Sequence, residues 1–233
     1  KSAAKVWEKR QFKDLDDKAQ LGARNIKVAL RKLRQFARTG AAEELDLDNT
    51  IRATAKNAGM LDLRLVPERH NAVKVLLILD VGGSMDPYIQ VCEELFSACR
   101  GEFKHLEHFY FHNFVYESVW RSNMRRHNEP TPLYDVLRTY GRDYKVIFVG
   151  DASMSPYEIM SPYGSVEHMN TEAGHVWMQR LTNHFDKVAW LNPVAQDHWH
   201  FTQSIGLTQE LVSDKMYPMT LSGLGDAIKA LTR

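Results

Sequence analysis

Residues 73–88 read VKVLLILDVGGSMDPY, and this stretch decides the fold. Its first half is a nearly unbroken run of branched, apolar side chains, typical of a strand that is buried on both faces of a parallel sheet. The run ends on Asp80 and enters a loop with Gly82 and Gly83, which let the backbone turn tightly. A buried strand that ends on a carboxylate beside such a loop indicates a ligand site at the edge of a sheet.

Two later stretches repeat the buried-strand pattern. DYKVIFVGD at 143–151 ends on Asp151, and DKVAWLNP occupies 186–193. Helical patterns lie between these strands and one closes the chain, while residues 105–120 read as one long strand or a hairpin. This alternation predicts an α/β fold with a doubly wound, mostly parallel sheet flanked by helices.

Two helices are predicted ahead of the sheet. Apolar side chains recur at helical spacing between Leu21 and Phe36, which predicts a helix that ends near Thr39–Gly40. The opposite face of this helix is rich in arginine and lysine. A second, shorter helix is predicted at 49–58, with Asp48 as its N-cap. The alternating stretch 61–66 then favours an edge strand.

These patterns divide the chain into a basic helical segment at 1–60 and an α/β domain at 61–233. The first 70 residues hold 16 basic and 10 acidic side chains, whereas the remaining 163 hold 14 and 19. The asymmetry indicates an arm for an acidic partner, or two halves of the chain that lie against each other. A nucleic-acid adaptor is a further alternative through phosphate contacts, but the basic face lacks interleaved aromatic residues and a base-reading motif.

Cysteine and hydropathy patterns bear on the compartment. Cys92 and Cys99 fall in one predicted helix, two turns or roughly 10 Å apart, which is too far for a disulfide. Two free thiols favour a reducing compartment, so we expect a cytoplasmic protein. No apolar run approaches the ~18 residues that spanning a bilayer needs, and we expect no membrane association.

The carboxyl ends of the predicted strands gather oxygen-bearing side chains. Because these ends meet at one rim of a parallel sheet, residues that are distant in sequence can become neighbours there. Carboxylate and hydroxyl oxygens are hard donors, which suit Mg²⁺, with Mn²⁺ or Ca²⁺ as alternatives. The candidate metal ligands are Asp80, Ser84, Thr131 and Asp151, with Gly82 and Asp86 as loop contributors.

These residues resemble a known family. DVGGS at 80–84, Thr131 before a proline, and the strand-terminal Asp151 are similar to the metal-ion-dependent adhesion site of von Willebrand factor A (VWA) domains, written D-x-S-x-S, then T, then D. More narrowly, the chain resembles the bacterial CoxE-like branch, in which a basic helical region precedes the domain. WLNP follows a late strand in that branch, and here it is Trp190–Pro193.

The resemblance implies a role in recognition. In the family, serine and threonine oxygens coordinate the ion, aspartates bind it directly or through water, and a carboxylate of the partner completes the shell. Carried over, Asp80, Ser84 and Thr131 would hold the ion, and Asp151 would act through water. The resemblance further implies a non-enzymatic protein-binding module that acts with a MoxR-type AAA+ ATPase, or its client, in maturation or remodelling of another protein.

The sequence departs from the family pattern at one position. Gly82 stands where the first serine is expected, so a side-chain hydroxyl is missing and water would have to replace it. Because Mg²⁺ commonly keeps several waters, such a degenerate site is compatible with binding. The missing hydroxyl predicts weaker affinity, and a vestigial site without an ion is the alternative.

A hydrolase is the enzymatic alternative at the same rim, through Ser84 or a bound metal. The loop that carries Ser84 resembles a nucleophile elbow, and Asp151 with His175 or His200 would follow in a permitted order. However, Asp86 occupies the position of the second glycine of that motif, and nothing in the sequence singles out either histidine. We therefore expect a protein without enzymatic activity.

Overall fold

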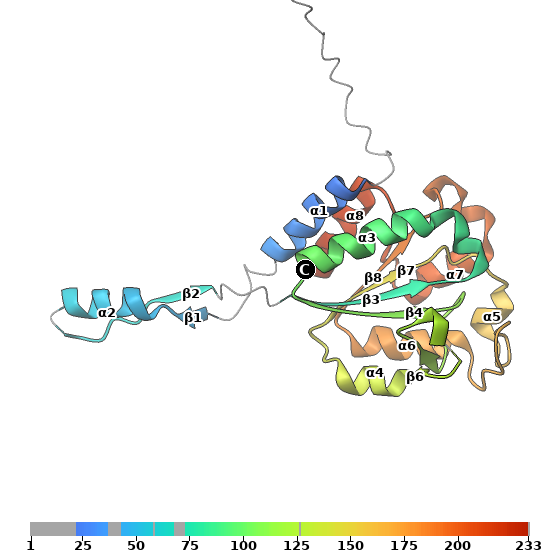
Figure 1. Ribbon diagram of the computed structural model, residues 1–233, viewed down its shortest axis with the longest axis horizontal. Helices are drawn as coiled ribbons and strands as arrows, with labels where there is room; N and C mark the ends of the chain where they lie inside the picture. Colours follow the sequence, from blue (N-terminus) through green and yellow to red (C-terminus); the bar gives the residue numbers. More distant parts are fainter. Residues whose placement is uncertain (1–21, 37–42, 58, 68–72, 126, 233) are drawn as a thin grey trace, which may run out of the picture.

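The computed structural model describes residues 22–36, 43–57, 59–67, 73–125 and 127–232. Its centre is a five-stranded sheet with the order β4-β3-β7-β8-β9, in which every neighbouring pair is parallel (Figure 1). The strands are β3 (Lys74–Asp80), β4 (His105–Phe111), β7 (Lys145–Val149), β8 (Lys187–Asn192) and β9 (Met216–Pro218). The predicted doubly wound, mostly parallel α/β sheet is thus confirmed.

Helices cover both faces of this sheet (Figure 1). One face carries α1 (Ala23–Phe36), α3 (Ile89–Glu102) and α8 (Leu221–Thr232). The other carries α4 (Leu133–Thr139), α5 (Pro156–Met160), α6 (Gly174–His184) and α7 (Gln203–Leu211). Short 3₁₀ helices complete the chain: η1 (Gly83–Tyr88), η2 (Asn123–Arg125) and η3 (Gln196–Phe201).

The central strand shows why the sheet has two cores. In β3, Leu76 and Ile78 join the cluster under α4 to α7, while Leu77 and Leu79 join the cluster under α1, α3 and α8. Successive side chains of a strand point to opposite faces, so a strand covered on both sides must be apolar at every position. The unbroken apolar run that the sequence shows is the direct consequence.

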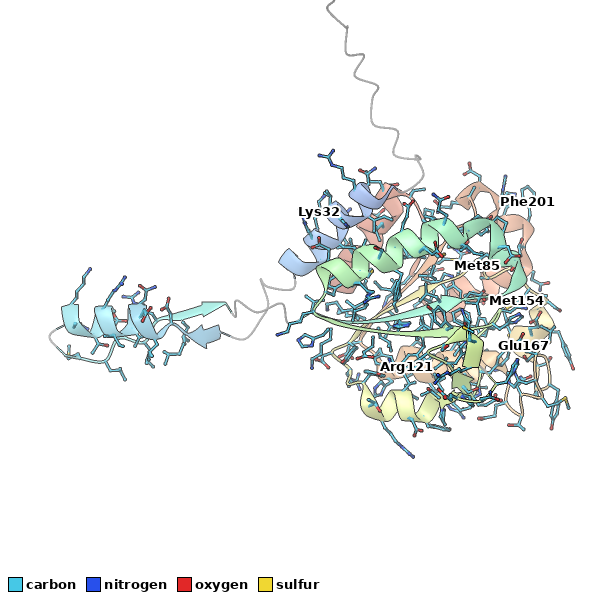
Figure 2. The ribbon with its side chains drawn as sticks, viewed as in Figure 1. Lys32, Met85, Arg121, Met154, Glu167 and Phe201 are labelled. Atoms are coloured by element: carbon cyan, nitrogen blue, oxygen red, sulfur yellow. The ribbon has the colours of Figure 1, made fainter. Side chains whose placement is uncertain are left out.

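Helix α1 packs on the sheet domain. Its buried face consists of Ile26, Ala29, Leu30 and Leu33, which lie in the same cluster as α3 and α8. Arg31 on its rim pairs with the buried Glu102 of α3 at 3.1 Å, and Lys32 lies on the outer side (Figure 2). The structure thus places the first predicted helix against the sheet domain, while the boundary at residue 60 stays a prediction.

Residues 43–57 and 59–67, which come between α1 and β3, form a small unit, here called the arm. Strands β1 (Glu43–Leu45) and β2 (Leu65–Pro67) pair antiparallel, and α2 (Leu47–Lys56) connects them. Figure 1 shows the arm away from the sheet and its helices. Seven of its large apolar side chains are exposed: Leu45, Leu47, Ile51, Met60, Leu61, Leu63 and Leu65.

Several local predictions differ from the structure. The N-cap of α2 is Asp46, which accepts a hydrogen bond from the Asn49 N–H, so Asp48 lies inside the first turn. The edge strand expected at 61–66 is restricted to β2, which begins at Leu65. The end expected for the first helix, near 39–40, lies outside the described residues. Among the helices these residues form, none is long and apolar enough to cross a membrane.

The hairpin interpretation of 105–120 is the one that the structure shows. β4 turns back into β5 (Ser118–Val119), with a bridge between Tyr110 and Trp120. β5 in turn pairs with β6 (Thr131–Pro132), which leads directly into α4. Thr131 is therefore a strand residue, and Pro132 occupies the N-cap position of α4.

Candidate functional site

Two carboxylates lie at the carboxyl rim of the sheet. Asp80 is the last residue of β3, and Asp151 follows β7, the strand beside it. When the five strands are numbered in chain order, they lie in the sheet as 2-1-3-4-5. The chain leaves β3 toward β4 on one side and leaves β7 toward β8 on the other side. Such a switch point opens a crevice where ligands bind in doubly wound sheets. The two aspartates flank it.

The two oxygens of Asp80 have different surroundings. Oδ1 accepts hydrogen bonds from the N–H groups of Gly82 at 2.8 Å and Asn113 at 2.9 Å, which holds both loops at the rim. Oδ2 is buried and has no hydrogen-bond partner among the described atoms. Burial raises the pKa of Asp80 to about 7, with the charges of Asp151 and Glu158 adding to the rise and the two hydrogen bonds opposing it.

Gly150 leaves room for this carboxylate. A Cβ at position 150 would lie 3.0 Å from the Cβ of Asp80 and 3.3 Å from its Oδ2, which is tighter than ordinary packing. The glycine before Asp151 therefore gives the Asp80 side chain room that a larger residue would reduce.

The loop that carries Asp151 is clamped from three sides. Asp151 Oδ1 accepts a hydrogen bond from the Ser153 N–H at 3.0 Å, and the Asn192 side chain donates to the Asp151 carbonyl at 2.9 Å. Trp190 donates from Nε1 to the Gly150 carbonyl at 2.8 Å. Trp190 and Asn192 belong to the WLNP stretch, so that stretch fixes the second carboxylate of the rim.

The remaining predicted ligands take different places. Ser84 and Asp86 lie in η1 with exposed side chains, directly after β3, whereas Met85 between them is buried at the carboxyl end of the sheet (Figure 2). Gly82 is buried against Asp80. The structure therefore keeps Asp80 and Ser84 within one short turn.

Thr131 lies in the strand pair that follows β4. It pairs with Val119 of β5 in a two-stranded sheet of its own, and β5 is joined to β4 by the bridge between Tyr110 and Trp120. Val119 and Leu133 are buried in the same core cluster as Phe111. The role of Thr131 as a ligand beside Asp80 stays a prediction.

Two rim residues were not anticipated from the sequence. Asn113, in the turn after β4, donates from Nδ2 to Glu158 Oε2 at 2.9 Å. Glu158 is buried in α5, where its Oε1 accepts from the Ser155 N–H at 3.3 Å in a capping box. The S-x-x-E spacing of Ser155 and Glu158 is a signal of that box, and an asparagine directly after a strand is a turn signal.

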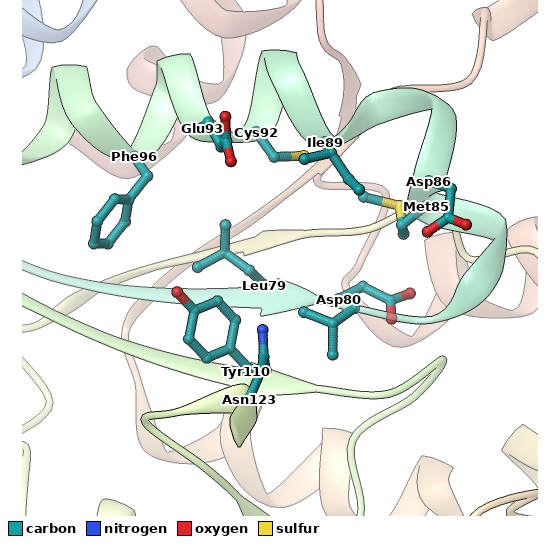
Figure 3. A pocket seen from close by; sticks show the side chains of 11 residues that line it. Leu79, Asp80, Met85, Asp86, Ile89, Cys92, Glu93, Phe96, Tyr110 and Asn123 are labelled. Atoms are coloured by element: carbon teal, nitrogen blue, oxygen red, sulfur yellow. The ribbon is translucent and has the colours of Figure 1, made fainter. Parts of the chain in front are cut away.

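A cavity of about 280 Å³ opens beside Asp80, between α3 and β4 (Figure 3). Its wall is mainly apolar and aromatic, and Asp86 and Glu93 add carboxylates. The apolar and aromatic lining residues are Leu79, Val81, Met85, Ile89, Phe96 and Tyr110. A side chain of a partner that reaches the rim could therefore bury apolar surface next to Asp80.

The histidines considered for a triad lie elsewhere. His175 contacts the Ile159 carbonyl at 3.3 Å, and the ring of His200 lies 3.8 Å from that of Phe201. Among the side chains that the structure describes, Ser84 has no hydrogen bond to a histidine. His200 lies in η3.

The family comparison agrees with this geometry. Residues 20–119 match the family model described as VWA domain containing CoxE-like protein. Over these residues the chain is similar to CoxE-like VWA domain proteins. The match runs from α1 through the arm to β5, so it includes Asp80 and Ser84 and ends before Thr131 and Asp151. No curated protein and no solved structure matches the chain.

VWA domains are in general protein-interaction modules, and the match gives this chain that general role. They often bind a metal ion, which raises the question of whether these residues fit one. In the described parts of the chain, no three histidine, cysteine, aspartate or glutamate side chains are arranged to hold a metal. The unpartnered Oδ2 of Asp80 and the nearby hydroxyl and amide oxygens nevertheless fit a hard cation that takes few carboxylates and several waters.

Proposed function

We propose that this VWA domain binds a partner protein at the carboxyl rim, without catalysing a reaction, and that a divalent cation forms part of the contact. Mg²⁺ is the proposed ion, with Mn²⁺ or Ca²⁺ as alternatives that use the same oxygen donors. The observation that carries the proposal is Asp80 Oδ2, a buried acceptor without a hydrogen-bond partner among the described atoms. Leaving such an oxygen unsatisfied costs stability, and a cation would supply the missing interaction.

Asp80 and Ser84 would hold the ion, and Asp151 would act through water. When bound, the ion supplies a positive charge that a carboxylate of the partner can ligate. Thr131, in the strand pair that follows β4, would be the third residue that holds the ion.

The chain's own residues preorganise the rim. The N–H groups of Gly82 and Asn113 orient Asp80, and Asn192 holds the loop of Asp151. Side chains that are fixed before binding lose less conformational entropy in the complex. The cavity beside Asp80 adds apolar surface for the partner, so recognition combines a charged contact with hydrophobic burial.

The proposed partner is a MoxR-type AAA+ ATPase or its client, in the cytoplasm. The CoxE-like match supports this choice, because it is the partner that the family resemblance implies. An acidic residue on the partner's surface is the chemical feature that the rim would recognise.

Binding of a MoxR-type ATPase to the immobilised chain tests the proposal, measured by biolayer interferometry with Mg²⁺ and after chelation. Chelation and Asp80→Ala should each weaken binding about tenfold or more, since each removes part of a charge-assisted contact. Asp226→Ala is the matched control, because Asp226 is an exposed carboxylate that pairs only locally with Lys229 on α8. Binding that survives both chelation and Asp80→Ala would refute the metal-dependent mechanism.

A further inference from the structure

The missing serine of the D-x-S-x-S pattern leaves no empty space. A Cβ added to Gly82 would overlap the Oδ1 of Asn113 and would lie 3.2 Å from Asp80 Oδ1. The volume that a serine side chain would occupy is therefore filled by an amide oxygen, which comes from the turn after β4. Glycine at position 82 and asparagine at position 113 are two parts of one arrangement.

The orientation of the Asn113 amide follows from its neighbours. Its Nδ2 donates to Glu158 Oε2 at 2.9 Å, and a carboxylate can only accept. The amide nitrogen must face Glu158, so the amide oxygen faces Gly82 and the Asp80 carboxylate. Glu158 is itself held, because its second oxygen accepts from the Ser155 N–H.

The backbone also places Asn113 at the rim. Its N–H donates to Asp80 Oδ1 at 2.9 Å, and the Phe114 N–H donates to the His112 carbonyl at 2.6 Å, which closes a tight turn around it. The φ of Asn113 is 56°, a left-handed conformation that asparagine adopts more readily than most residues. Both its backbone and its side chain therefore depend on neighbours at this rim.

An amide oxygen can replace a hydroxyl oxygen as a ligand. Asparagine carbonyls are established donors to hard cations, and like a serine hydroxyl they are uncharged. The exchange keeps the number of oxygens and the net charge of the adhesion-site pattern. The buried, unpartnered Asp80 Oδ2 belongs to the same carboxylate that Asn113 contacts.

We infer that Asn113 Oδ1 takes the place of the first serine hydroxyl as an oxygen ligand of the divalent cation. The oxygen that is lost with the serine at position 82 is then supplied by Asn113. This inference rests on the proposed function, which supplies the cation.

The test titrates Mn²⁺ into the chelator-treated full chain, with free Mn²⁺ followed by electron paramagnetic resonance and Mg²⁺ binding followed by calorimetry. Asn113→Gly removes the amide, and glycine tolerates the left-handed backbone. The variant should bind Mn²⁺ at least tenfold more weakly, because loss of even an outer-shell contact to a metal costs about that much. Asn128→Gly, at an exposed turn asparagine, is the matched control and should bind like the wild type.

A second pair of variants tests the exchange itself. Gly82→Ser alone should lower both the melting temperature and the affinity, because its Cβ overlaps Asn113 Oδ1. Gly82→Ser combined with Asn113→Gly rebuilds the serine pattern and should recover binding close to that of the wild type. Recovery in the double variant is a result that simple damage to the fold does not produce.

The outcomes separate this inference from the proposed function. A wild type that binds neither Mn²⁺ nor Mg²⁺ overturns both. A folded Asn113→Gly variant that binds Mn²⁺ as tightly as the wild type overturns only the role of Asn113. If that variant does not fold, the test uses the nuclear magnetic resonance signal of the Asn113 side-chain amide in the wild type. Substoichiometric Mn²⁺ should broaden this signal. An unchanged signal refutes the inference.

Discussion

At the scale of single residues, Asp80 performs two tasks with one carboxylate. Oδ1 is a structural acceptor for two loop N–H groups, and Oδ2 is buried without a partner among the described atoms. The first task stabilises the fold and the second costs stability, because a buried charge is expensive when nothing compensates for it. A residue selected only for stability would keep the first property and lose the second.

Asp80→Asn separates these tasks. The amide keeps an acceptor for the N–H groups of Gly82 and Asn113 and removes the buried charge, so the chelator-treated variant should be more stable than the wild type at pH 8. We expect a gain of about 1–3 kcal/mol in the free energy of unfolding, measured by urea denaturation. Asp80→Ala, which loses the acceptor as well, should be less stable than Asp80→Asn. An Asp80→Asn variant that unfolds more readily than the wild type would contradict this account.

The cysteines give a prediction on pH dependence. Burial raises the pKa of Cys92 to about 11, with the charge of Asp80 adding to the rise, and burial raises that of Cys99 to about 12. The reactive thiolate is therefore a small minority at neutral pH, and its fraction grows with pH until the raised pKa is reached. Alkylation of Cys92 by iodoacetamide should speed up about tenfold per pH unit from pH 7 to 9, followed by mass spectrometry. A plateau near pH 8.5, as for an ordinary thiol, would show that the pKa is not raised.

At the scale of elements, the sequence predicts those elements whose signal lies within a few neighbouring residues. The strands ending near Asp80, Asp151 and Asn192 are continuous apolar runs, and such runs indicate buried parallel strands without reference to the rest of the chain. β9 has only three residues, Met216–Pro218, which are too few for a strand pattern to be recognised in the sequence. The role of Asn113 depends on Glu158, 45 residues away, so no local pattern could reveal it.

Thr131 shows how strand pairing can add structure that no local signal indicates. The chain pairs with β5 at Thr131, and α4 begins two residues later at Leu133. At Asp48 the local signal was misleading, because Asp46 reaches the Asn49 N–H first and becomes the cap of α2.

Helix α1 offers a test at the element scale. Leu30 is completely buried between α1, α3 and α8, so Leu30→Ala should lower the free energy of unfolding of the whole sheet domain by about 2–5 kcal/mol. Val28→Ala on the same helix is the control, because that side chain is half exposed, and it should change stability by less than about 0.5 kcal/mol. Equal effects of the two substitutions, measured by urea denaturation, would mean that α1 does not belong to the core.

At the scale of the whole molecule, the chain builds its core from two distant stretches. Helix α1 precedes the arm, the sheet follows it, and α1 packs between α3 and α8 on the sheet's face. The arm is thus an insertion within a domain, with its own strand pair and its own threonine contacts. Its seven exposed apolar side chains contrast with the closed core of the sheet domain.

Deleting the arm tests this organisation. A chain in which residue 42 is joined directly to residue 68 should keep the melting temperature of the sheet domain, because none of the described residues of the arm lies in either core of the sheet. Fluorescence of a dye that binds exposed apolar surface should fall, since the leucines of the arm are gone. A clear drop in the melting temperature, followed by circular dichroism, would show that the arm supports the domain.

The overlap between position 82 and Asn113 has an evolutionary consequence. A serine at position 82 requires the Asn113 side chain to move away, which disturbs its hydrogen bond to Glu158. Neither change can be made first without a loss, so the two forms of the rim are separated by a fitness valley. Descendants should then inherit one pair or the other, and the residue found at 82 would report on the residue at 113.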